Sequence, residues 1–494
     1  MTTSTSRPNI ILIITDQQRY DTIAALGYPH CDTPNLDRIA REGVVFSNCF
    51  VAGASCAPSR ASLFSGYYPH VAGVMRNADS WRTTWVQDLA ASGYHCVNVG
   101  KMHTYPFEAP SGFHERFVVE NKDRYLEGRF FFDRWDLAFQ AHGLEKPGRV
   151  KYRQLPDYKE RLGAIEWDLT GVPESLHPDN YVGNLARWWV EKKPQTQPLF
   201  LEVGFPGPHP PYDPPQRYVD PYLAKDFPLP HLSDTELAGL PPALHELRQH
   251  NAEIDHDSVF WSLTPSQDQL KRLWAHYLAN VTLIDEQVGL LVDALERQGY
   301  LENALVIFTS DHGDCLGDHG QVQKWTMHDC ITRVPFIAWS PNGIRYGPNG
   351  ADSLHLGGGR TEDGLWQQMD LAPVLMQLAG VPVPSDWQAV SMLPALNGNT
   401  PGAGRERVFC EQAGDNILTG TDLMTMVRTT DWKLVHYLDQ DQGELYDMRN
   451  DPEERHNLWG QSRHAAVQRE LTEALMSWRL HTGLRPRRTS LITS

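Results

Sequence analysis

The sequence predicts an α/β protein: a large, mostly parallel central sheet flanked by helices, followed by a smaller antiparallel sheet with a helix. Short continuous apolar runs, typical of strands buried on both faces, recur along the chain. Amphipathic helical patterns separate several of these runs, as expected where strands are parallel. Beyond about residue 400 the strand-like runs become short and closely spaced, which favours an antiparallel arrangement there.

The expected strands of the central sheet cover residues 9–15, 96–99, 199–204, 305–310 and 334–339. The clearest helix spans 270–297, where large apolar residues recur at steps of three and four positions. They form one stripe along the helix: Leu273, Trp274, Tyr277, Val281, Ile284, Val288, Leu291 and Leu295.

We expect two domains, a catalytic α/β domain over residues 1–400 and a C-terminal subdomain over residues 401–494. The second contains strand-like runs at 408–410, 424–428 and 433–437 and a helical pattern at 465–479. The segment 123–178 is rich in aromatic and charged residues but weakly periodic, so no element is predicted there.

Composition excludes several classes of partner. The chain has 494 residues and a formal net charge of −17, which argues against binding nucleic acid or an anionic membrane surface. No window approaches the roughly 18 apolar residues needed to span a bilayer. An anionic substrate would therefore need a local cationic pocket.

Two observations predict a cytoplasmic protein. The first residues, Met1 to Pro8, run directly into a strand pattern without a recognisable export signal. The seven cysteines, an odd number, are spread from Cys31 to Cys410 without close metal-type spacing, which suits free thiols in a reducing compartment. The oligomeric state stays open, a homo-oligomer included.

Cys56 carries the strongest functional signal of the chain. It begins a short helical pattern that contains Pro58 in the first turn, continues through Arg60 and stops at Gly66. At a helix start, free N–H groups and the helix dipole favour an anion. We therefore interpret Cys56 as a partly exposed nucleophile with a fixed cation nearby. The alternative is a buried structural cysteine.

Two expected strands end in residue pairs that could bind a metal ion. Asp16 and Gln17 follow the run at 9–15, and Asp311 and His312 follow the run at 305–310. Ligands collect at the carboxyl ends of strands in open α/β sheets. Two carboxylates, an amide oxygen and an imidazole could hold one divalent cation, with Cys56 as a further ligand, and the alternative is that these are turn or cap residues. Oxygen ligands suit Ca²⁺, whereas a nitrogen ligand moves the preference toward Mn²⁺.

The motif Cys56-Ala57-Pro58-Ser59-Arg60 resembles the signature of the sulfatases, within the alkaline phosphatase superfamily. The resemblance implies that a separate maturation enzyme oxidises Cys56 to Cα-formylglycine, whose hydrate is the nucleophile. It also extends to a Gly-Lys-x-His motif, a proline-rich loop, a further lysine and a C-terminal pattern, which carry Lys101, His103, His209, Lys324 and residues 444–448.

The resemblance also implies roles. Lys101 neutralises an anionic oxygen, His103 removes a proton from formylglycine, His209 contacts the sulfate, and His209 or Lys324 protonates the leaving oxygen. Each of these residues alone would more often be solvated surface. Gln17 and His312 depart from the commonest sulfatase set and resemble a branch of phosphonate monoester hydrolases and arylsulfatases.

These observations predict a hydrolase of small sulfate monoesters that contains one divalent metal ion. The same-class alternative is a phosphonate monoester or phosphodiester hydrolase with the same site, and a lesser one is an unmodified anion-binding protein. The organic part of the substrate is not legible in the sequence. Four residues near the catalytic ones in sequence could line its pocket or simply pack: Asn77, Tyr105, Trp325 and His328.

Overall fold

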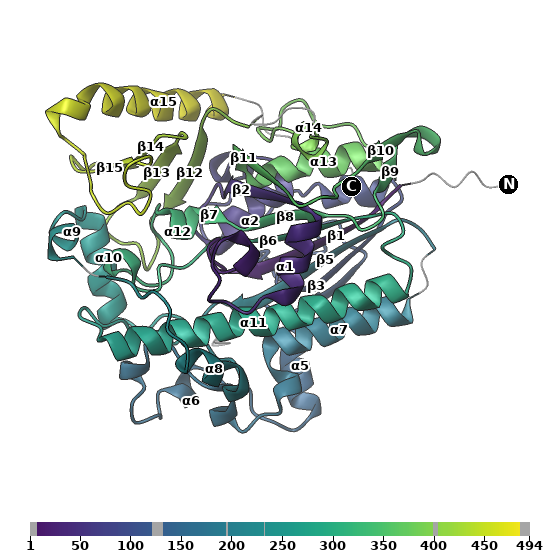
Figure 1. The fold of residues 1–494 in the computed structure, drawn as a ribbon, viewed down its shortest axis with the longest axis horizontal. Helices are drawn as coiled ribbons and strands as arrows, with labels where there is room; N and C mark the ends of the chain where they lie inside the picture. Colours follow the sequence, from purple (N-terminus) through teal and green to yellow (C-terminus); the bar gives the residue numbers. More distant parts are fainter. Residues whose placement is uncertain (1–6, 121–131, 194–195, 232, 399–403, 485–494) are drawn as a thin grey trace.

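A computed structural model describes residues 7–120, 132–193, 196–231, 233–398 and 404–484 (Figure 1). It confirms the predicted fold class, with a large mixed sheet and a separate four-stranded sheet. The expected domain boundary at residues 400 and 401 lies outside the described residues, so the division into two domains stays a prediction.

Within the described residues the central sheet has nine strands, with the order β11-β2-β8-β6-β1-β5-β3-β4 and with β7 paired to β2. Its middle strands are parallel: β1 lies between β5 and β6, and β3 lies between β5 and β4. The antiparallel β8 separates β6 from β2. The bounds are β1 Asn9–Asp16, β2 Val44–Phe50, β3 His95–Gly100, β4 Glu115–Val118, β5 Leu199–Pro208, β6 Ala304–Ser310, β7 Arg333–Val334, β8 Phe336–Trp339 and β11 Arg360–Gln367.

Helices cover both faces of this sheet because its central strands are apolar on both sides. In β1, Ile10, Leu12 and Ile14 belong to one hydrophobic cluster, and Ile11 and Ile13 belong to the other. Figure 1 shows α11 and α7 side by side along one face. The longer helices are α1 Pro34–Glu42, α2 Cys56–Ser65, α5 Arg134–Ala141, α7 Pro178–Lys192, α8 Gln216–Leu223, α10 Pro242–Glu253, α11 Gln267–Arg297, α13 Leu371–Ala379 and α15 Ala465–Gly483.

The C-terminal sheet is an antiparallel meander on which α15 packs (Figure 1). Its strands are β12 Val408–Ala413, β13 Leu423–Arg428, β14 Trp432–Tyr437 and β15 Glu444–Asp447. The strands and the helix expected from the sequence are therefore confirmed. The strands β2, β4 and β11 were not predicted from the sequence. In β2, the half-buried Ser47 and Asn48 interrupt the apolar run.

Strand register brings the predicted site residues to one edge of the central sheet. Thr15 pairs with Ser310, so Asp16 and Asp311 are the next residues on neighbouring strands. On the other side of β1, Asp16 pairs with Pro208, the residue before His209. Polar side chains therefore follow β1, β5 and β6 at the carboxyl ends of these parallel strands, where open α/β sheets bind ligands.

Lys101 reaches the same edge because β3 and β5 approach closely at two glycines. The Lys101 amide donates to the Gly204 carbonyl at 2.8 Å. A Cβ atom on Gly100 would lie 2.0 Å from the Gly204 oxygen, and one on Gly204 would lie 1.9 Å from the Lys101 oxygen. Only glycine fits at these two positions, and Gly100 also has a positive φ of 102°.

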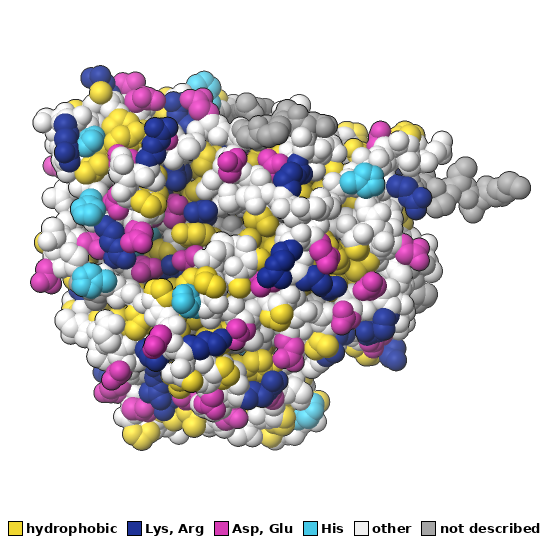
Figure 2. Space-filling model, viewed as in Figure 1, with side chains coloured by type: hydrophobic (Ala, Val, Ile, Leu, Met, Phe, Trp, Pro, Cys, Tyr) yellow, Lys and Arg dark blue, Asp and Glu magenta, His cyan; other side chains and the backbone are white. Residues whose placement is uncertain are grey.

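On the face shown in Figure 2, acidic and basic side chains are interspersed, with hydrophobic ones scattered between them. No helix among the described residues is long and apolar enough to cross a membrane.

Candidate active site

Cys56 is the first residue of α2, which confirms the predicted helix. Ser55 precedes it in extended conformation, and Gly66 ends the helix with a φ of 75°. The expectation of a partly exposed Cys56 is wrong, because the residue is only 1% exposed. Every residue of α2 is buried, since the helix lies between the central sheet and neighbouring helices that include α13.

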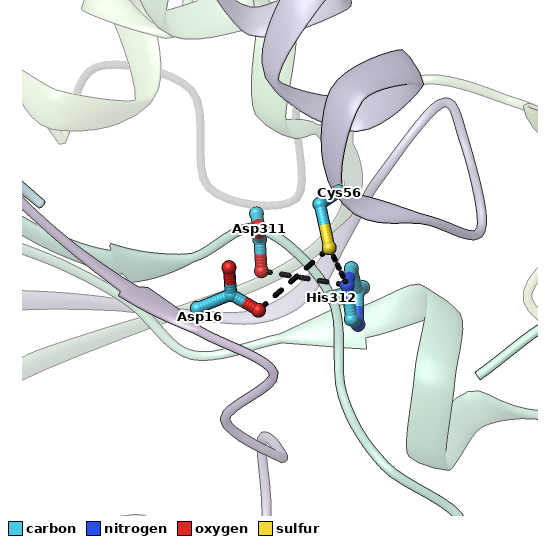
Figure 3. Close-up of side chains that lie close together, drawn as sticks. All are labelled: Asp16, Cys56, Asp311 and His312. Carbon is cyan, nitrogen blue, oxygen red and sulfur yellow. Dashed lines mark hydrogen bonds and ion pairs between the residues drawn. The ribbon is translucent and has the colours of Figure 1, made fainter. Parts of the chain in front are cut away.

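Four buried side chains form a group whose ligand atoms all lie within 4.8 Å of one another: Asp16, Cys56, Asp311 and His312 (Figure 3). Cys56 Sγ lies 3.7 Å from Asp16 Oδ1 and 3.1 Å from His312 Nε2. His312 Nδ1 bonds to the Gly313 carbonyl at 2.8 Å, which leaves Nε2 directed at the group. Two carboxylates and one imidazole in a buried position fit a divalent cation.

Gln17 lies beside this group with a φ of 71°. Its backbone N–H donates to Asp311 Oδ1 at 3.0 Å, and its side-chain oxygen accepts from Lys324 Nζ at 3.0 Å. Its amide nitrogen donates to Asp314 at 2.6 Å, and Tyr212 donates to the same carboxylate oxygen, also at 2.6 Å. Asp314 therefore orients the Gln17 amide so that its oxygen faces Lys324.

Three fully buried cations surround the acidic group. Arg60 Nε donates to Asp311 Oδ2 at 2.7 Å, and the Lys101 ammonium forms an ion pair with Asp16. Lys324 Nζ lies 3.2 Å from Cys56 Sγ. Buried charges at such short distances interact strongly because water screens them weakly. The chain of −17 net charge thus gathers three buried cations around the position of Cys56.

The cations determine the ionisation of the group. Burial alone would raise the pKa of Asp16, but Lys101 above all, with His209 and Arg60, holds this pKa well below its usual range. Burial opposes the charge on Lys324, yet Cys56 and Asp16 raise the pKa of the Lys324 ammonium above its ordinary value. Asp16 is therefore an anion and Lys324 a cation at neutral pH.

Two histidines flank the site. Burial, and then the charge of Lys324, lowers the pKa of His209 to about 3. His209 Nδ1 donates to the Pro210 carbonyl at 2.7 Å, and its Nε2 lies 3.6 Å from Asp257. Burial, and then Lys101, also holds the pKa of His103 well below its usual value. Both imidazoles are thus neutral at neutral pH.

The four expected substrate-binding residues lie in different surroundings. Asn77 accepts from the Ala57 amide at 3.3 Å, one residue from Cys56, and the buried Trp325 donates to Asp415. Tyr105 is 41% exposed. His328 is buried against the C-terminal sheet, where its Nε2 lies 3.4 Å from Glu444. Their role in binding substrate stays a prediction.

Two acidic residues of the site were not predicted from the sequence, Asp314 and Asp257. Asp314 follows Asp311 by three positions, so its place in the same strand-end loop was a usable signal. Asp257 belongs to a loop without a recognisable motif, and only the structure brings it to His209.

Fold and site together define a hydrolase of the alkaline phosphatase superfamily. The family model described as Sulfatase matches residues 8–381, and a model of the C-terminal region of N-sulphoglucosamine sulphohydrolase matches residues 317–481. The chain belongs to the sulfatase family and is a sulfuric ester hydrolase.

Curated relatives match over nearly the whole chain. An arylsulfatase of Clostridium perfringens is 29% identical over 92% of this chain and 90% of its own length. An N-acetylglucosamine-6-O-sulfatase of Bacteroides thetaiotaomicron is 28% identical over 95% of this chain and 86% of its own length. Among solved structures, a phosphonate monoester hydrolase of Agrobacterium radiobacter has a TM-score of 0.77 at 24% identity and 96% coverage of both chains, which supports the fold.

Proposed function

We propose that this protein hydrolyses sulfate monoesters through a formylglycine derived from Cys56, with one divalent metal ion. The observation that best supports this proposal is the position of Cys56. It lies between a group of metal-type ligands, Asp16, Asp311 and His312, and the ammonium of Lys324. A group at this position can attack a sulfur whose oxygens are held by cations on several sides.

The residues that would hold the metal are Asp16, Asp311 and His312, together with Gln17 through its side-chain oxygen. When bound, the cation supplies positive charge that lowers the pKa of the attacking oxygen and neutralises the sulfate. The imidazole among the ligands keeps Mn²⁺ beside Ca²⁺ as a candidate.

The surrounding cations bind and orient the sulfate. Arg60 and Lys101 are fixed by Asp311 and Asp16, so their positions are set before substrate arrives. Lys324 completes the arrangement next to the attacking atom. Such preorganised charges stabilise a sulfuryl group in a loose transition state because its charge is spread over three oxygens.

The protonation states of His103, His209 and Lys324 indicate which residue acts as the acid and which as the base. The neutral His103 is suited to accept the proton of the second formylglycine hydroxyl, a step that releases sulfate and restores the aldehyde. His209 is neutral, and its proton on Nδ1 is donated to Pro210, so it has no proton to give from Nε2. This favours Lys324 as the donor to the leaving oxygen.

The main alternative is hydrolysis of phosphonate monoesters or phosphodiesters at the same site. Gln17 and His312 favour it, because this pair resembles the branch that contains phosphonate monoester hydrolases. Lys101 and His103 favour sulfate, because they match the sulfatase motif. A structural neighbour with 24% identity is described as holding its substrate D-glucosamine-2-N,6-O-disulfate, so sugar sulfates belong in the substrate panel beside aryl sulfates.

The deciding experiment compares kcat/KM for an aryl sulfate and an aryl phosphonate monoester with the same leaving group. We expect the sulfate to be preferred and Lys101→Ala to reduce sulfate hydrolysis more than phosphonate hydrolysis. Faster processing of the phosphonate by the wild-type enzyme would assign the alternative function.

Intact-protein mass tests the nucleophile, because conversion of the Cys56 thiol to the aldehyde removes about 18 Da. Cys56→Ala should lack this mass change and lose turnover by more than about 10³-fold, as expected for a nucleophile acting with its partners as a unit. Cys96→Ala, at another buried cysteine, is the matched control and should retain activity. An unmodified and inactive wild-type protein would instead support the anion-binding alternative.

Chelation tests the metal. Removal of divalent ions should inactivate the enzyme, and added Mn²⁺ or Ca²⁺ should restore activity. Asp311→Asn should bind metal more weakly in calorimetry, since the site loses a charged ligand. Unchanged activity after exhaustive chelation would exclude a required metal.

A further inference from the structure

We infer that a cavity beside the active site binds an uncharged sugar ring next to the sulfated unit of the substrate. This inference rests on the proposed function and extends it to a substrate class, singly sulfated oligosaccharides. The cavity has a volume of about 770 Å³, within the usual range for small-molecule sites. It lies between α6 (Arg149–Tyr152), the turn that follows it, and the segment after α10.

A single turn joins the cavity to the catalytic residues. His256 lines the cavity, and its carbonyl accepts from the side chain of Gln323, the neighbour of Lys324. The next residue, Asp257, lies 3.6 Å from His209 Nε2. Its side chain is 21% exposed, so solvent reaches the turn between the cavity and His209.

Charges in the cavity wall balance. Arg149, Arg153 and Lys159 face an equal number of carboxylates, those of Glu160, Glu253 and Asp255. A wall with no net charge gives little attraction to a second anionic group, and Arg149 and Arg153 already pair with Asp255. The cavity therefore differs from the sulfate site, where three buried cations lie around Cys56.

The wall offers fixed hydrogen-bond donors. Asp255 accepts from Arg153 Nε at 2.8 Å and from Tyr158 at 2.8 Å, which holds the guanidinium in place. Among the described residues, Arg153 pairs only through Nε, so its two terminal NH₂ groups remain available to a ligand. Glu160, which lines the same cavity and is exposed, offers carboxylate oxygens as acceptors.

Apolar surface accompanies these polar groups. Phe260, Leu155 and Ile254 line the cavity, and Lys159 Nζ lies 4.2 Å from the centre of the Phe260 ring. A sugar ring has apolar C–H faces and a periphery of hydroxyl groups that donate and accept hydrogen bonds. The mixture of apolar side chains, donors and acceptors without net charge matches this chemistry.

The test compares three sulfate esters: p-nitrophenyl sulfate, a sulfated monosaccharide, and a disaccharide whose second ring is neutral. Wild-type enzyme should show the highest kcat/KM for the disaccharide. Arg153→Ala and Phe260→Ala should lower that value about tenfold, as for residues in the centre of a binding site, and leave the aryl sulfate unchanged. Arg297→Ala, an exposed arginine on α11, is the control and should change none of the three.

Equal losses on all three esters, or no loss on the disaccharide, would overturn the inference. So would a preference for a disaccharide with a carboxylate on the second ring. If wild-type enzyme cleaves no sulfate ester, the proposed function fails separately. Calorimetry with the unsulfated disaccharide then decides, since binding weakened by Arg153→Ala supports the cavity and absent binding rejects it.

Discussion

Arg60 and Asp311 form a fully buried ion pair at the centre of the site, with Nε of the arginine 2.7 Å from Oδ2 of the aspartate. The same guanidinium donates to the Lys101 carbonyl at 2.8 Å. Burial opposes the charge on Arg60, but Asp311 and Asp16 hold its pKa above the ordinary value. One side chain thus links α2 to the ends of β6 and β3.

Arg60→Ala should therefore destabilise the protein as well as inactivate it. The substitution leaves Asp311 buried without its partner, which typically costs about 3–5 kcal/mol. Urea unfolding of the metal-free protein measures this loss. Arg469→Ala on the exposed side of α15 is the control, with an expected change within about 0.5 kcal/mol. Equal stability of the Arg60 variant and wild type would show that the pair contributes nothing.

Glu202 should make stability depend on pH. It lies fully buried in the middle of β5, and burial raises its pKa from 4.5 to about 8 despite Arg60, Asn98 and Arg116. Between these two values the unfolded chain loses the proton that the folded protein retains. Stability therefore falls as the pH rises from about 4.5 to about 8, by an amount on the order of 5 kcal/mol.

Glu202→Gln removes this effect because an amide cannot ionise. Thermal unfolding should show equal stability of variant and wild type near pH 4.5 and a more stable variant at pH 8. Glu296→Gln, at an exposed position of α11, should follow the wild-type curve. A variant less stable than wild type at pH 8 would indicate that Glu202 is ionised and well paired.

Lys433 of β14 should be essential for the loop that carries Lys324. This fully buried lysine donates to the Met327 carbonyl at 2.9 Å and forms ion pairs with Asp329 and Glu454. Lys433→Met removes the cation that pairs with Glu454 and the nearer of two that pair with Asp329, and should cost about 3–5 kcal/mol. Lys433→Arg keeps the charge and should lose less. Denaturant unfolding distinguishes these outcomes, and a fully stable methionine variant would contradict them.

Thiol titration tests the expected state of the cysteines. All seven are buried and free, and the sulfurs of Cys315 and Cys330 lie 4.0 Å apart. Under denaturing, non-reducing conditions we expect six reactive thiols, because the proposed function requires an oxidised Cys56. Seven would show unmodified Cys56. Two or more disulfides would contradict the prediction of a cytoplasmic protein, which otherwise stays untested.

Much of the fold could be predicted from the sequence because buried strands and amphipathic helices have regular patterns of apolar residues. The sequence predicted that Asp16 and Asp311 lie near each other, since each follows a buried strand and parallel strands end at one edge of the sheet. Their actual adjacency depends on the register of β1 and β6, which the pattern does not specify. The interrupted strand β2 escaped for the lack of a continuous apolar run.

The rest of the site depends on contacts between distant segments. Lys324 lies in a loop without periodicity, so only the family resemblance pointed to it. The direction of the Gln17 amide is determined by Asp314 and Lys324. Asp257 could not be found from the sequence, because its approach to His209 depends on how two unrelated loops pack.

The complete burial of α2 determines when Cys56 can be modified. All ten residues of this helix are buried in the folded protein, so an oxidising enzyme cannot bind the segment around the thiol. The proposed modification of Cys56 would therefore have to precede the closure of the core, while the chain is still unfolded. Protein that folds before it meets that enzyme would remain a stable thiol form, and the active fraction would depend on the race between oxidation and folding.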